Sequence, residues 1–178
     1  GPMHKRIQDL IKAEIPDVFG TKILDIGCGL GNYSALFNKA TYVGFDLDPR
    51  YISEARTKFA QANRTFDVGD AVSPPRFSQT FNRMFSVGLY HHLSDEDTIN
   101  SIKSITPLIS KGGSLLVFDA VYPKGYNPAG YFLRRIDRGK YVRTFPAYEK
   151  LLQDNFKLTY INYHTAGVLD FVAYKINV

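Results

Sequence analysis

Three glycines at alternate positions follow a short apolar stretch near the start of the chain. Residues 22–26 are typical of a buried strand in a parallel sheet, and Gly27, Gly29 and Gly31 come directly after it. Because glycine has no Cβ, a turn this rich in glycine allows a ligand to lie against the main chain. Asp25 sits at the carboxyl end of the predicted strand, which is the end where open α/β sheets bind ligands.

Two more acids occupy equivalent places further along the chain. Asp46 lies near the end of the apolar stretch 42–47, and Asp70 follows Gly69 after the stretch 64–68. A single aspartate after a strand is most often a helix cap. Three acidic sites at the ends of three successive strands predict one ligand site, where carboxylates accept hydrogen bonds from the ligand.

Composition limits the class of protein. The chain has 178 residues, 44% of them hydrophobic, which is enough for one domain with a substantial core. Gly1 and Pro2 are typical of a protease-cleavage scar, so we expect a single domain over 3–178. No apolar run approaches ~20 residues, so we expect no membrane partner. The single cysteine, Cys28, has no partner for an internal disulfide, which fits a reducing compartment and predicts a cytoplasmic protein.

The alternation of predicted elements indicates an α/β fold. Apolar spacing, caps and breaker residues place helices at 3–15, 33–39, 49–62, 95–109 and 146–155. The same patterns place strands at 22–26, 42–47, 64–68, 83–87, 114–120, 157–164 and 168–176. Five strands that alternate with helices and are followed by a hairpin predict an open sheet.

The motifs at the strand ends resemble those of the class I S-adenosylmethionine-dependent methyltransferases. Asp25–Gly31 is similar to the first motif of that family, Asp46 to the acid that ends its second strand, and Gly69–Ala71 to its third motif. Lys111–Leu115 resembles the usual start of its fifth strand. The resemblance, closest over residues 20–120, implies a Rossmann-like seven-stranded sheet whose antiparallel last strand lies between the fifth and sixth. It also implies the cofactor S-adenosyl-L-methionine and the product S-adenosyl-L-homocysteine.

The resemblance gives each acid a role that its chemistry supports. Asp25 would accept from the ammonium group of the cofactor, Asp46 from the two ribose hydroxyls, and Asp70 from the adenine amino group. Leu47 would pack on the adenine face, and the amide of Ala71 would donate to a ring nitrogen. The expected cofactor-binding residues are Asp25, Gly27, Cys28, Gly29, Gly31, Asp46, Leu47, Asp70, Ala71 and Gly88.

Two other functions share part of this pattern. A nicotinamide dinucleotide also requires an acid after the second strand, but its fingerprint needs glycine at the sixth place of G-x-G-x-x-G. Counted from Gly27 or from Gly29, that place holds Asn32 or Ser34, which disfavours an NAD-dependent oxidoreductase. A non-catalytic cofactor-binding partner subunit is disfavoured because such a subunit need not keep every acidic contact.

Two histidines, His91 and His92, follow the fourth predicted strand, at the mouth where the methyl group would be presented. In-line methyl transfer needs a base only where the acceptor keeps its proton, and histidine is the commonest general base near neutral pH. The alternative is that one histidine braces the next helix and the other is exposed. Gly88 and Leu89 supply no carboxylate for magnesium, and Asp119 offers a single ligand, so we expect no metal.

Residues 122–145 interrupt the alternation and carry the excess charge. Six lysines and arginines minus one aspartate give +5, the net charge of the whole chain, and aromatic residues lie between them. We predict that this segment, with a short helix between Asn127 and Gly139, is a lid over the acceptor. A small anionic acceptor, or RNA as the alternative, would be held by guanidinium groups and stacked rings. Alternatively, the segment has no binding role, and its arginines form a solvated helix face. The expected acceptor-binding residues are Tyr90, Tyr122, Tyr126, Arg134 and Arg138, the last two on one helix face.

Overall fold

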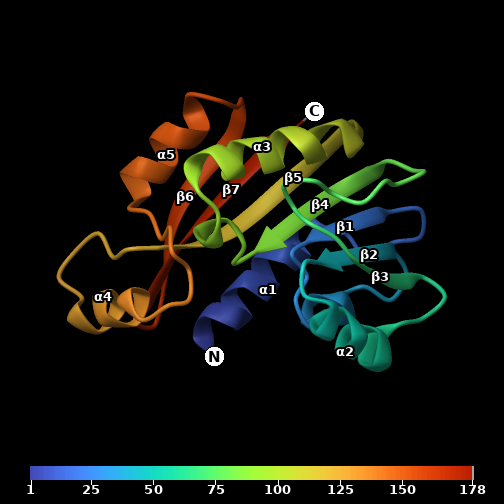
Figure 1. Cartoon of the computed structure of the whole chain (residues 1–178), viewed down its shortest axis with the longest axis horizontal. Helices are drawn as coiled ribbons and strands as arrows, with labels where there is room; N and C mark the ends of the chain where they lie inside the picture. The colour runs from blue at the N-terminus through green and yellow to red at the C-terminus, as the bar shows by residue number, and fades with distance from the viewer. Residues whose placement is uncertain (178) are drawn as a thin grey trace.

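The computed structural model describes residues 1–177 and contains a seven-stranded sheet with helices on both faces (Figure 1). The strands are β1 (Lys22–Ile26), β2 (Thr41–Asp46), β3 (Arg64–Val68), β4 (Phe81–Val87), β5 (Ile109–Val121), β6 (Leu158–Ala166) and β7 (Leu169–Asn177). The helices are α1 (Pro2–Glu14), α2 (Pro49–Phe59), α3 (Asp95–Ile105), α4 (Pro128–Arg135) and α5 (Phe145–Gln153), with 3-10 turns η1 (Asn32–Leu36), η2 (Tyr90–His92) and η3 (Thr106–Leu108). Val178, the end of the expected domain, lies outside the described residues.

The strands follow the order β3-β2-β1-β4-β5-β7-β6 in the sheet. Neighbouring strands from β3 to β5 pair in parallel. β7 lies between β5 and β6 and is antiparallel to both. This topology confirms the open Rossmann-like sheet with an antiparallel last strand. Because β1 to β5 run in one direction, their carboxyl ends meet at one edge, where the acids and glycines singled out in the sequence come together.

Alternating side chains of the sheet build a core on each face. Leu24 belongs to the core that contains residues of α3 and α5, whereas Ile23 belongs to the core that contains residues of α1 and α2. Figure 1 shows these helix pairs on opposite sides of the sheet. α1 contributes Ile7 and Ile11, which are four apart and therefore share one helix face. In residues 1–177, no helix combines the length and apolar character needed to cross a membrane.

Two local predictions differ from the structure. The helix expected at 33–39 is only the 3-10 turn η1, because the carboxylate of Asp17 accepts hydrogen bonds from the amides of Asn38, Lys39 and Ala40. These bonds replace the ones that would continue a helix. β5 begins at Ile109 rather than at residue 114, and the expected turn at 111–113 is a bulge within the strand.

Gly31 is required by both the backbone and the packing. Its φ is 73°, and an added Cβ would lie 2.7 Å from Cε1 of Phe66 and 3.1 Å from Cβ of Ala55. Gly112 has a similar φ of 75°, but its added Cβ would meet nothing within 4 Å. We expect Gly112→Ala to lower the free energy of unfolding by about 1–2 kcal/mol through the backbone alone. Gly31→Ala should lower the free energy of unfolding by about 1–3 kcal/mol more than Gly112→Ala does, because its Cβ overpacks the core.

Urea unfolding of the two variants checks this prediction, since both carry the same backbone penalty. Equal losses in the free energy of unfolding would show that the aromatic ring of Phe66 moves aside without cost.

Candidate cofactor and acceptor site

A cavity of about 550 Å³ opens at the carboxyl ends of β1 to β4, and we call it the strand-end cavity. Nine of the ten expected cofactor-binding residues line it: Asp25, Gly27, Cys28, Gly29, Asp46, Leu47, Asp70, Ala71 and Gly88. The tenth, Gly31, does not line the cavity, because it packs against Phe66 and Ala55. Other lining residues, Tyr33, Tyr51 and Leu89 among them, are not marked by any sequence motif, although each of these three lies within a few positions of an expected residue.

Asp46 is held rigidly at the rim of β2. Its Oδ2 accepts a hydrogen bond from the amide of Gly29 at 2.9 Å, and its Oδ1 accepts from the amide of Asp48 at 2.9 Å. Each carboxylate oxygen keeps further lone pairs. The carboxylate therefore connects the glycine turn after β1 to the start of α2 and still has acceptors for a ligand.

Asp25 lies deeper in the same cavity and is buried, with 1% of its surface exposed. Its Oδ2 accepts a hydrogen bond from the hydroxyl of Tyr42 at 2.5 Å. Burial raises the pKa of Asp25 to about 7, the Tyr42 hydrogen bond opposes this rise, and the charge of Asp46 adds to it. A cationic group of a ligand placed beside Asp25 would favour its ionised form.

The residues present fit S-adenosylmethionine. The lining combines three carboxyl groups that can accept hydrogen bonds, on Asp25, Asp46 and Asp70, with an open glycine turn, since an added Cβ on Gly29 would meet nothing within 4 Å. A volume of about 550 Å³ lies within the range of cofactor pockets. A dinucleotide fits less well, because the short turn η1 stands where a nicotinamide-binding fold places the helix that receives a pyrophosphate.

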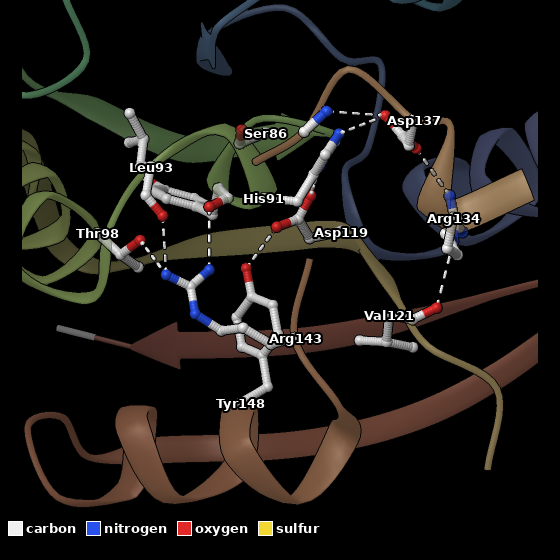
Figure 2. Close-up of polar contacts among 12 residues, drawn as sticks. Ser86, His91, Leu93, Thr98, Asp119, Val121, Arg134, Asp137, Arg143 and Tyr148 are labelled. Carbon is white, nitrogen blue, oxygen red and sulfur yellow. Dashed lines mark hydrogen bonds and ion pairs between the residues drawn. The ribbon is translucent and has the colours of Figure 1, made fainter. Parts of the chain in front are cut away.

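His91 and His92 have different environments. His91 is 6% exposed and does not line the strand-end cavity. Its Nδ1 lies 2.6 Å from Oδ1 of Asp119, and its Nε2 lies 3.6 Å from Oδ1 of Asp137 (Figure 2). Burial lowers the pKa of His91, but the hydrogen bond to Asp119 and the charges of Asp119 and Asp137 outweigh burial and raise it. Of the two candidate bases, His91 therefore lies outside the strand-end cavity and is held between two carboxylates.

His92 does line the strand-end cavity, and its ring packs on His91 with the centroids 4.1 Å apart. Burial lowers the pKa of His92, and the neighbouring charge of His91 lowers it further. The imidazole of His92 is therefore neutral at pH 7 and able to accept a proton, so it is the better candidate for a base.

The segment 122–145 is tied to the body of the protein by two of its own arginines. Arg134 is 5% exposed and donates from Nε to the carbonyl of Val121 and from Nη2 to the carbonyl of Asp170. Arg143 is 8% exposed and donates to the carbonyl oxygens of Tyr90 and Leu93 (Figure 2). These two cations are used inside the fold and are not available to bind an anionic acceptor.

The expected acceptor-binding residues do not form one site. Tyr90 is fully buried in the core, so it is not on a binding surface. Arg138 lies beyond the end of α4, so it does not share a helix face with Arg134. Tyr126 is 99% exposed, and Tyr122 stacks on Tyr131 at a centroid distance of 5.6 Å. Within residues 1–177, neither of the two cavities described here is lined by Tyr90, Tyr122, Tyr126 or Arg138.

A smaller cavity of about 130 Å³ adjoins the first, and we call it the side cavity. It shares Val87 and Gly88 with the strand-end cavity. Its other walls come from α1, from β5 and β7, and from the polar residues His91, Asp119, Arg134 and Asp137.

Asp119, the single carboxylate that the sequence offers a magnesium ion near the end of β5, is engaged on both oxygens. It is 2% exposed and pairs with His91 and with the hydroxyl of Tyr148. Among residues 1–177, no group of three or more histidine, cysteine or acidic side chains is placed to hold a metal ion.

Comparison with known proteins gives the class. Residues 23–113, just over half of the chain, match the family model described as a methyltransferase domain. The chain therefore belongs to the methyltransferase-domain family, and its fold is that of the class I S-adenosylmethionine-dependent methyltransferases.

Individual relatives differ in what their names say they methylate. The chain is 28% identical over 114 residues to probable tRNA methyltransferase 9B of Homo sapiens, covering 64% of this chain and 24% of that protein. It is 29% identical over 143 residues to phosphoethanolamine N-methyltransferase 1 of Triticum aestivum, covering 76% of this chain and 28% of that protein. The chain thus spans about a quarter of the length of these curated relatives.

A solved S-adenosylmethionine-dependent methyltransferase of Aquifex aeolicus has the same fold, with a TM-score of 0.73 at 16% sequence identity. The match covers 96% of this chain and 89% of that chain.

Proposed function

We propose that this chain binds S-adenosyl-L-methionine in the strand-end cavity and transfers its methyl group to a small acceptor. The observation that carries the proposal is the convergence of Asp25, Asp46 and Asp70 with the glycine turn on one cavity, in a chain of the methyltransferase-domain family. When bound, the cofactor supplies an electrophilic methyl group on a sulfonium whose leaving group is a neutral thioether. The protein then has to orient the reactants, exclude water and accept a proton where the acceptor carries one.

The position of each lining residue indicates the part of the cofactor or acceptor that it would contact. Asp46 would receive the ribose hydroxyls, because its two oxygens are oriented by the amides of Gly29 and Asp48. Asp25 would receive the ammonium group, and Asp70 with Leu47 would receive the adenine. His92 would accept the proton of the acceptor, since it lines the strand-end cavity, whereas His91 lines the side cavity and is already paired with Asp119.

The acceptor is proposed to place its methylated end near Gly88, where the two cavities share a wall. The side cavity holds only about 130 Å³, so it fits a small group. Arg134 and Arg143 do not supply charge for an anionic acceptor, because they bind carbonyl oxygens of the fold. We propose that the segment 122–145 is the lid over this region, because Arg134 and Asp137 line the side cavity.

RNA is the second candidate acceptor. The human relative is named as a tRNA methyltransferase, and four cations of the segment 122–145, Lys124, Arg135, Arg138 and Lys140, are exposed. Incubation with radiolabelled cofactor and either a panel of small amines, alcohols and acids or total tRNA separates the two acceptors. Label that becomes nuclease-sensitive would establish RNA as the acceptor, and no label in any acceptor would favour a cofactor-binding subunit without catalysis.

Calorimetry tests which cofactor the protein binds. S-adenosyl-L-homocysteine should bind and NAD should not. Because Asp25 has a pKa of about 7, its ionisation on binding of the ammonium group should release protons just below pH 7. Repeating the titration in buffers with different ionisation enthalpies measures that release, and Asp25→Asn should abolish it. Binding of NAD without binding of S-adenosyl-L-homocysteine would contradict the proposed function.

A further inference from the structure

Helix α4 presents its apolar side to solvent. The helix and its cap bury Gly130 and Arg134. In contrast, Phe132 is 62% exposed, Leu133 is 37% exposed and Ile136 is 61% exposed. Surface helices normally place the apolar stripe inward and the charges outward, so α4 has the reverse arrangement. Figure 1 shows α4 at one end of the molecule, apart from the helix layers on the sheet.

Neighbouring side chains extend this surface beyond the helix. Tyr126 is 99% exposed and Tyr131 is 47% exposed. The turn between β6 and β7 adds Val168, which is 49% exposed and whose carbonyl accepts a hydrogen bond from Nδ2 of Asn127 at 3.1 Å. We call this surface the α4 patch; its members are Tyr126, Tyr131, Phe132, Leu133, Ile136 and Val168. A group of six exposed apolar side chains is larger than the scattered residues that a soluble surface ordinarily shows.

Three cations lie within a few residues of the α4 patch in the sequence. Arg135, Arg138 and Lys140 are exposed, and in residues 1–177 none of them forms an ion pair. The acid of this segment, Asp137, is directed to Arg134 and His91 instead. A binding partner must therefore be both apolar and anionic.

Three kinds of partner can be compared with this requirement. RNA would use the rings and the cations but not Leu133, Ile136 and Val168, since aliphatic side chains provide no stacking surface. A second copy docked symmetrically would bring the same unpaired cations against each other. The interface of an anionic bilayer accepts all three kinds of side chain, because aliphatic groups enter the acyl boundary, tyrosines lie at the headgroups and cations contact anionic lipids.

We propose that the α4 patch is a docking surface for an anionic lipid bilayer and that the protein binds there peripherally. Such binding requires no membrane-spanning helix, so it agrees with the finding that no helix in residues 1–177 is long and apolar enough to cross a membrane. It replaces the expectation, drawn from the lack of a long apolar run, that the protein has no membrane partner. It would bring the segment 122–145 to the membrane. The proposal does not depend on which acceptor is methylated.

The absence of tryptophan from the chain allows a direct test. Phe132→Trp introduces the sole tryptophan into the α4 patch. With vesicles of phosphatidylcholine and phosphatidylserine, its emission should shift to the blue, and with phosphatidylcholine alone the shift should be small. High salt should reverse most of the shift, because the attraction between cations and anionic lipids is screened. Phe19→Trp is the matched control, since Phe19 is 82% exposed outside the patch, and its emission should not move.

Vesicle sedimentation with patch variants completes the test. Ile136→Ser with Leu133→Ser, and separately Arg135→Ser with Arg138→Ser, should each reduce the bound fraction at least tenfold, whereas Lys111→Ser should not. Unchanged binding of S-adenosyl-L-homocysteine shows that these variants are folded. Absence of vesicle binding by the unaltered protein would overturn the proposal. So would patch-dependent binding of RNA or patch-dependent dimerisation in its place.

Discussion

Replacing His92 with alanine is expected to lower kcat by about 10²–10⁴-fold and to leave the affinity for S-adenosyl-L-homocysteine unchanged. The reason is that His92 lines the strand-end cavity as a neutral imidazole, whereas His91 is held between Asp119 and Asp137. Steady-state kinetics with an acceptor from the panel and calorimetry with the product measure the two effects. His164→Ala is the matched control, because burial lowers the pKa of His164 as well, but this residue lies on β6 away from the cavity.

The pH dependence of kcat separates proton transfer from packing. A base must be neutral, and the pKa of His92 is lowered from its ordinary value of 6.5. At saturating cofactor, kcat should therefore rise with pH through a value below 6.5 and be constant above it. The groups that act on this pKa are His91, Asp119, Asp137 and Asp46. Asp25 titrates at about 7, and its ionisation should appear in kcat/KM for the cofactor.

A loss of less than tenfold in His92→Ala, or a pH step that persists in this variant, would contradict a base at this position. Catalysis would then rest on orientation of the reactants alone.

Asp46→Ala is expected to weaken binding of S-adenosyl-L-homocysteine by about 1–3 kcal/mol, because the ribose hydroxyls lose a charged acceptor. The variant also frees the amides of Gly29 and Asp48, which the carboxylate connects at 2.9 Å each. Calorimetry at constant pH and salt measures the change. The control is Asp67→Ala on the neighbouring strand β3, where the carboxylate is 54% exposed and pairs with Arg56. This control should bind as the unaltered protein does.

Urea unfolding of Asp46→Ala distinguishes loss of the ligand contact from loss of the fold. If the variant unfolds at the same urea concentration as the unaltered protein and binds S-adenosyl-L-homocysteine with the same affinity, Asp46 is not part of the cofactor site.

The cofactor region could be predicted from the sequence because its signals are local. Each of Asp25, Asp46 and Asp70 stands within two residues of a strand end and within three residues of a glycine or a helix start. Parallel strands bring their carboxyl ends to one edge whatever their exact packing, so the order of motifs in the chain was enough to group these acids. The fold followed from the same alternation of apolar stretches and turns, and the sheet order confirmed it.

The roles of the histidines and arginines depended on the tertiary structure. His91 and His92 are adjacent in the chain, yet one faces Asp119 on β5 and the other faces the strand-end cavity. Arg134 donates to a carbonyl 36 residues away, and Arg143 donates to one 50 residues away. A basic segment has the same sequence pattern whether its cations face solvent or bind carbonyl oxygens of the fold. Only the packing of distant segments decides between the two, because a buried charge is stable only where the fold supplies its hydrogen-bond partners.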